Sequence, residues 1–127
     1  MPTLLLVLAV FHGINGVFML AAPTLWYESV PGVVETGPAN AHFIRDIGLG
    51  FLAAAVALAL AARNANRSLL LPAVTFLGGH AGLHLVEMIT HGVTVATALR
   101  DAATVVLPGL LPLLALRSKR ATAAGRA

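Results

Sequence analysis

The chain has 127 residues, of which 58% are hydrophobic and only 10% are charged, and its formal net charge is +3. Soluble domains carry about 25% charged residues, so the composition excludes a soluble enzyme and a nucleic-acid-binding protein. The absence of cysteine also excludes disulfides, thiolate metal sites and iron–sulfur clusters. We therefore expect a small integral membrane protein, with the lipid bilayer as its first partner.

Four segments are long and apolar enough to cross a bilayer, which requires about 20 consecutive apolar residues. They are residues 3–22, 41–62, 69–91 and 94–116. The first ends before Pro23, and the second follows Asn40, which we expect to cap it. The third ends at Gly92, and the fourth contains Pro108 and Pro112, which predict a kink. The pattern predicts an all-α bundle of four transmembrane helices.

The distribution of basic residues predicts the orientation of this bundle. Residues 63–67 form a short basic loop, and four of the eight basic residues lie in the last eleven positions. The connection formed by residues 23–40 has no Lys or Arg. By the positive-inside rule, both termini face the cytoplasm. We expect one domain, residues 1–120, in a bacterial inner (plasma) membrane, followed by a disordered basic tail, 121–127.

The connection between the first two spans contains two turn signals, Val30-Pro31-Gly32 and Thr36-Gly37-Pro38. Because proline reduces the freedom of a loop, we expect an ordered segment that covers the outer face of the bundle. Trp26 and Tyr27 fall just after the first span, where interfacial aromatic residues are common.

Ionisable residues are expensive inside a span and usually face the interior of a bundle. Here each span carries its polar residues at helical spacing, on one face. They are His12 and Asn15; His42, Arg45 and Asp46; His80, His84, Glu87 and His91; and Thr97, Arg100, Asp101 and Thr104. A rise of about 1.5 Å per residue places most of these groups in one outer layer, with His12 and His80 deeper.

One interpretation of this layer is purely structural. Arg45 would pair with Glu87 or Asp101, and Arg100 would pair with Asp46, so that buried ion pairs fix the register of the helices.

A second interpretation is a metal centre. His80, His84 and Glu87 share one face of the third span, and His42 and Asp46 share a face of the second. Imidazoles and carboxylates without sulfur suit iron, copper, manganese or zinc. Such a centre in the outer half of the bundle would be linked to redox chemistry, as in a membrane oxidoreductase.

A third interpretation is haem b, with His12 and His80 as axial ligands. Glycines flank both histidines, and glycine lets a planar macrocycle approach the backbone. The same glycines also fit close helix packing, because Gly78 and Gly82 form a small-xxx-small motif.

Two further interpretations need no cofactor. Histidines and carboxylates relay protons in small transport elements. A chain of this size also fits an accessory subunit of a larger membrane complex, or a homo-oligomer. The sequence leaves these alternatives open.

Overall fold

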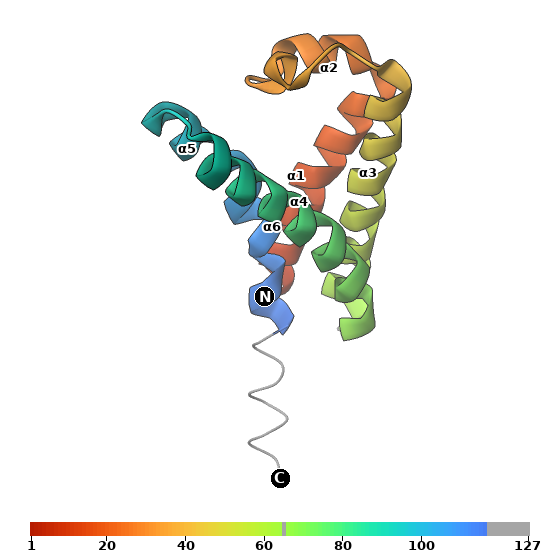
Figure 1. The fold of residues 1–127 in the computed structure, drawn as a ribbon. Coiled ribbons are helices and arrows are strands. Elements are labelled where there is room, and N and C mark those ends of the chain that lie inside the picture. The colour runs from red at the N-terminus through yellow and green to blue at the C-terminus, as the bar shows by residue number, and fades with distance from the viewer. Residues whose placement is uncertain (65, 117–127) are drawn as a thin grey trace.

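The computed structural model describes residues 1–64 and 66–116, which are helical throughout apart from short connections and contain no strand (Figure 1). The tail predicted to be disordered, residues 121–127, lies outside the described residues. The elements are α1 (Pro2–Ala21), α2 (Pro23–Ser29), the 3₁₀ helix η1 (Val33–Thr36), α3 (Ala41–Asn64), the 3₁₀ helix η2 (Arg67–Leu69), α4 (Leu70–His91), α5 (Val95–Asp101), the π-helical segment η3 (Ala102–Val106) and α6 (Leu107–Leu110). The ends of α1, α3 and α4 lie close to the predicted ends.

Three helical stretches are long and apolar enough to cross a membrane, rather than the four that the sequence predicts. Within the described residues they are α1, α3 and the continuous stretch Val95–Leu116, which contains α5, η3 and α6. The missing one is α4. It is long enough, but its three histidines and Glu87 reduce its mean hydropathy. The polar residues that suggested a buried site therefore also weaken the evidence that α4 is a span.

Helices α1 and α3 lie side by side, and two glycines set their close approach (Figure 1). A Cβ atom on Gly16 would lie 2.8 Å from the carbonyl oxygen of Gly48. A Cβ atom on Gly48 would lie 2.8 Å from the Cβ of Met19. Only glycine lets the two backbones meet at this distance.

Helix α4 packs on α3, η3 and α6, and α5 projects away from the α1–α3 pair (Figure 1). A Cβ on Gly109 would lie 2.7 Å from the carbonyl oxygen of Leu77, so this glycine lets α6 approach α4. The first residue of the chain and residue 116, where the described chain stops, lie at the same end of the bundle. This arrangement is compatible with these two residues lying on one side of a membrane.

Residues 23–40, which we name the outer segment, are ordered as the turn signals predict. They form α2 and η1 and lie across the opposite end of the bundle from the N-terminus (Figure 1). Trp26 Nε1 donates to Oδ1 of Asn15 at 2.9 Å, which ties α2 to α1. Tyr27 Oη donates to the carbonyl of Gly37 at 2.7 Å, which closes the segment on itself. Asn40 caps α3 as expected, because the Phe43 amide donates to its Oδ1 at 3.1 Å.

Candidate functional site

The predicted site residues separate into an exposed pair and a more shielded cluster. His42 and Asp46 pair one helical turn apart on α3, with 3.4 Å between Nε2 and Oδ2. Their side chains are 89% and 56% exposed, so water solvates both. No hydrogen bond or ion pair in the described part of the chain joins them to α4. They do not form a common site with His84 and Glu87.

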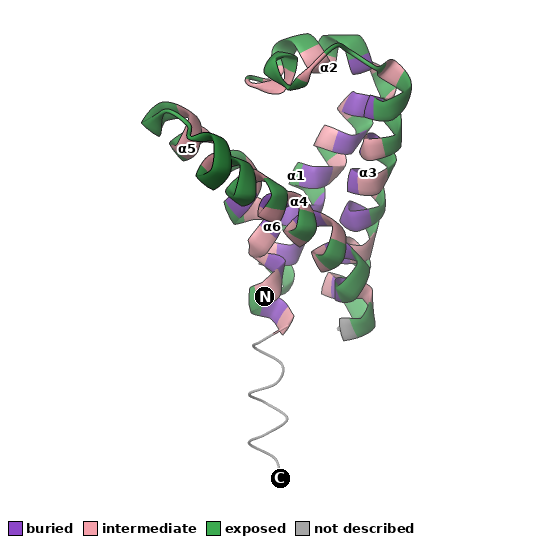
Figure 2. Ribbon diagram, in the orientation of Figure 1, coloured by how far each residue is buried: buried purple, intermediate pink, exposed green. Residues whose placement is uncertain are grey.

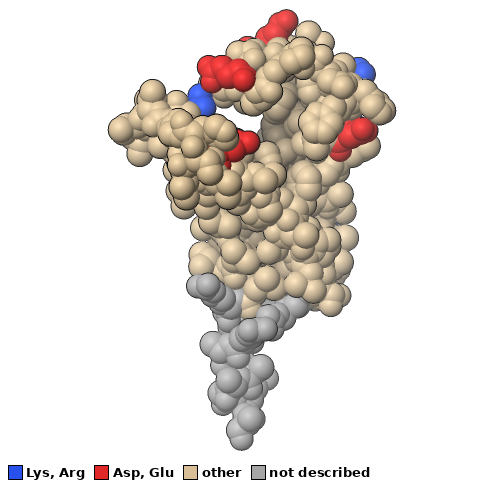
Figure 3. All heavy atoms as spheres, viewed as in Figure 1, with Lys and Arg blue, Asp and Glu red and all other residues tan. Residues whose placement is uncertain are grey.

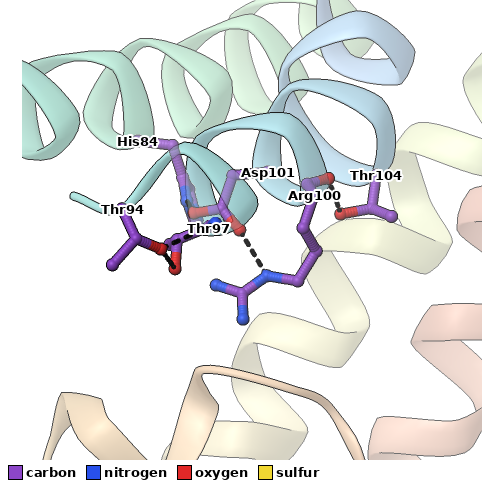
Figure 4. Close-up of polar contacts among 6 residues, drawn as sticks. All are labelled: His84, Thr94, Thr97, Arg100, Asp101 and Thr104. Carbon is purple, nitrogen blue, oxygen red and sulfur yellow. Dashed lines mark hydrogen bonds and ion pairs between the residues drawn. The ribbon is translucent and has the colours of Figure 1, made fainter.

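The shielded cluster joins α4 to α5 through one carboxylate (Figure 4). Oδ2 of Asp101 lies 3.5 Å from Nδ1 of His84, and Oδ1 accepts from Nε of Arg100 at 2.8 Å. The Asp101 side chain is only 14% exposed, and that of His84 is 28% exposed. We name His80, His84, Arg100 and Asp101 the polar cluster. Its ionisable side chains lie where α4 and α5 meet.

Local hydrogen bonds define both ends of α5, the helix that carries Asp101. Thr94 caps α5 by accepting from the Thr97 amide at 3.2 Å, and Thr104 Oγ1 donates to the carbonyl of Arg100 at 2.8 Å. Asp101 is the last residue of α5, and the π-helical η3 begins immediately after it. π-Helical turns occur often at functional sites.

His80 extends the polar cluster toward the centre of the bundle. Its ring contacts that of His84, with 4.9 Å between centroids. On its other side it meets Phe51 edge-on at 5.4 Å, and Phe51 in turn stacks on His12 at 5.8 Å. The two histidines expected to ligate haem are therefore near the same level, and both pack against the same phenyl ring, which comes from α3.

His12 has a structural partner of its own. It is buried, and its Nε2 lies 3.4 Å from the carbonyl oxygen of Pro108 on α6. A carbonyl oxygen only accepts, so Nε2 carries the proton of this hydrogen bond. The other ring nitrogen, Nδ1, is buried and has no hydrogen-bond partner.

The ion pairs expected between helices are different from those observed. Arg100 pairs with its neighbour Asp101 and not with Asp46. Arg45 pairs with neither Glu87 nor Asp101, and its Nε instead donates to the carbonyl of Leu20 at 3.3 Å. Glu87 is exposed on α4. These residues were expected to pair because they lie at similar depth in the bundle. They do not pair, because α4 and α5 lean away from the end of α3 that carries Arg45 and Asp46 (Figure 1).

The ligand set expected for a metal is not assembled. Within residues 1–64 and 66–116, no three or more His, Asp or Glu side chains gather closely enough to hold a metal ion. His42 and Asp46 stand apart, and Glu87 makes no ion pair in this part of the chain. His80, His84 and Asp101 are the candidates that the fold brings nearest to one another.

Arg100 also touches the outer segment. A Cβ atom on Gly32 would lie 2.7 Å from Nη2 of Arg100 and 3.3 Å from Nη1, so the guanidinium lies directly against this residue. Gly32 has φ of +89°, a conformation that favours glycine. The space-filling view shows a hollow beneath the outer segment, with acidic atoms at its edge (Figure 3).

Sequence reasoning missed two residues that organise this region. Phe51 was not singled out, because a phenylalanine in an apolar span carries no signal of its own. Pro108 was expected only to kink its helix, although the pair Pro108 and Pro112 implies a carbonyl without a helical donor. That spacing was the signal that could have identified the partner of His12.

Comparison with known proteins adds no further identification. No protein-family model, curated protein sequence or solved structure matches the chain.

Proposed function

We propose that this chain is an integral membrane protein that uses the polar cluster to accept and release protons, as a small proton-coupled transport element. The observation that carries this proposal is the contact between His84 Nδ1 and Asp101 Oδ2 at 3.5 Å, made between two helices and largely shielded from solvent. Ionisable side chains are retained in apolar bundles mainly for function, and His–carboxylate chains are typical of proton relays.

The proposal places α4 in the bilayer as a fourth helix. Its outward face is apolar, and Leu71, Leu83, Val86 and Ile89 are each more than half exposed. Figure 2 shows exposed positions along the other helices too, and on α1 they include Val7, Val10, Ile14 and Val17. Exposed apolar surface of this extent suits lipid better than water. On the polar face of α4, His84 meets Asp101 of α5, whereas Glu87 is exposed.

In this arrangement both termini face the cytoplasm and the outer segment faces outward, as the positive-inside rule indicates. The membrane is the bacterial inner membrane, and residues 1–120 form one domain within it. The polar cluster then lies in the outer half of the bundle, within reach of the external aqueous phase through the hollow beneath the outer segment.

Proton movement across proteoliposomes, followed with an internal pH-sensitive dye, tests the proposal. Asp101→Asn removes the ionised partner of His84 and should reduce proton flux at least ~tenfold, since positioned proton-transfer groups commonly contribute more than that. Asp46→Asn is the matched control, because Asp46 also pairs with a histidine but is 56% exposed. It should leave the flux unchanged. Equal flux in wild type, Asp101→Asn and protein-free vesicles would refute a proton-transfer role.

A redox metal centre is the second candidate, and one observation favours it. His80, His84 and Asp101 offer two imidazoles and one carboxylate along a continuous set of contacts, and such ligands suit iron, copper, manganese or zinc. The side chains would have to draw together around the ion. Metal analysis of the purified protein, with His80→Gln as the comparison, tests it.

The haem hypothesis gains no support from this arrangement, because His12 and His80 both pack against Phe51 and His12 already has the Pro108 carbonyl as a partner. The role of accessory subunit, or of a protomer in a homo-oligomer, predicts a stable complex on purification in mild detergent. Such a complex together with absent proton flux would favour that alternative.

A further inference from the structure

We infer that Arg100 latches the outer segment over the polar cluster, so that this segment is a lid that controls access to the His84–Asp101 pair from the outer phase. The inference rests on the proposed function, because it assigns a means of regulation to the same site. Three observations carry it: Gly32 contacts Arg100, the outer segment is hydrogen-bonded to the bundle, within the described residues, on the side of α1 and not on that of α5, and a hollow lies beneath the segment.

The outer segment is held firmly on one side only. On the side of α1 it has the Trp26–Asn15 hydrogen bond at 2.9 Å, and Pro23 is buried where α2 begins. In the described chain, no hydrogen bond or ion pair joins residues 23–40 to α4, α5 or η3. The close contact on that side is the packing of Gly32 against the Arg100 guanidinium. The side at α1 therefore acts as the hinge, and the side at Arg100 acts as the latch.

The latch is chemically joined to the site that it covers. Asp101 uses Oδ1 for Arg100 and Oδ2 for His84, so one carboxylate orients both side chains (Figure 4). A charge-assisted hydrogen bond of this kind fixes a guanidinium more strongly than a neutral one. The guanidinium, so fixed, lies directly against Gly32. Any change in the Asp101 carboxylate therefore reaches the outer segment through Arg100.

Figure 3 shows the space that this contact borders. The hollow lies beneath the outer segment, and α5 borders it on one side. With the segment resting on Arg100, the His84 side chain is only 28% exposed. Raising the segment would widen the hollow on the side of α5 and expose the imidazole.

Chemical modification of histidines by diethylpyrocarbonate, read residue by residue by mass spectrometry, tests the inference on the intact chain in lipid nanodiscs. His42 is an internal reference, because its side chain is 89% exposed and lies outside the polar cluster. Gly32→Ala places a methyl group against Arg100 and should weaken the closed state of the lid. We expect the rate of His84 modification to rise about fivefold, as for a small loss of stability. The rate of His42 modification should stay the same.

Gly37→Ala is the matched control. Gly37 also has a positive φ, of +127°, so alanine strains the same segment, but nothing lies within 4 Å of the added Cβ. We expect its His84 rate to match wild type. Arg100→Gln should reproduce the effect of Gly32→Ala from the other side of the contact.

Equal rates in Gly32→Ala and wild type would overturn the inference, as would an equal increase in Gly32→Ala and Gly37→Ala. Failure of the latch is distinguishable from failure of the proposed function. If only the latch is wrong, the proton flux still depends on Asp101, but Gly32→Ala does not raise the modification rate of His84. If only the proposed function is wrong, the flux does not depend on Asp101, but Gly32→Ala still raises the modification rate of His84.

Discussion

The imidazole Nε2 of His12 lies 3.4 Å from the carbonyl oxygen of Pro108, across 96 residues of sequence. In a regular helix the amide of residue 112 would donate to this carbonyl, but residue 112 is proline and has no N–H. An unpaired carbonyl in an apolar bundle costs several kcal/mol. His12 on α1 therefore supplies a donor that the last helix lacks.

Replacing this donor should destabilise the protein only while Pro112 is present. We expect His12→Leu to cost about 1–3 kcal/mol, the usual cost of leaving a buried polar group unpaired. In a Pro112→Ala background the helix regains its own donor, and the same change should cost below ~1 kcal/mol. Unfolding in detergent, carried out as a double-mutant cycle, measures the difference. Equal costs in both backgrounds would show that the histidine packs without donating.

The contact of α1 with α3 should not tolerate even a methyl group. Gly16→Ala would bring a Cβ within 2.9 Å of the Leu52 amide nitrogen and 2.8 Å of the Gly48 oxygen. These are backbone atoms, so the helices must separate, at a cost of about 1–3 kcal/mol. Gly79→Ala is the control, since nothing lies within 4 Å of its Cβ. Thermal unfolding should place the control at or above wild type; a stable Gly16→Ala would contradict the packing.

Two aspartates should differ sharply in their contribution to stability. Asp101→Ala leaves Arg100 and His84 without their shared partner in a shielded position, and we expect a cost of about 3–5 kcal/mol. Asp46→Ala removes a solvated pair at the outer end of α3 and should cost below ~1 kcal/mol. Chemical unfolding of the two variants in the same detergent compares them. If the order is reversed, the shielding of Asp101 is not the dominant effect.

The hydrogen bond from Trp26 to Asn15 should be visible by fluorescence, because Trp26 is the only tryptophan. Asn15→Ala removes the acceptor, and we expect the emission to shift to longer wavelength as the indole nitrogen turns to water. Thr24→Ala, at an exposed position of α2, should leave the spectrum unchanged. An unshifted spectrum in Asn15→Ala would mean that other contacts hold α2 in place.

The ends of the main helices could be predicted because prolines, glycines and Asn40 mark them locally. The number of helices apolar enough to span a membrane could not, since the same histidines that define the face of α4 reduce its hydropathy. Residue depth could be estimated from the rise per residue, which placed His12 and His80 near one level. Which polar side chains contact one another could not be predicted, because these contacts depend on how the helices cross. Glycines at positions 16, 48 and 109 set those crossings through contacts with backbone atoms of other helices.

The π-helical segment η3 also fixes the direction in which the polar cluster faces. The Leu107 amide donates to the carbonyl of Ala102, five residues earlier, so this turn holds one residue more than an α-helical turn. One residue corresponds to a rotation of about 100° around the axis. Deleting Ala103 would restore a regular turn and rotate α5 relative to α6, carrying Asp101 away from His84. The proximity of these two side chains thus depends on a single extra residue in the helical turn that follows Asp101.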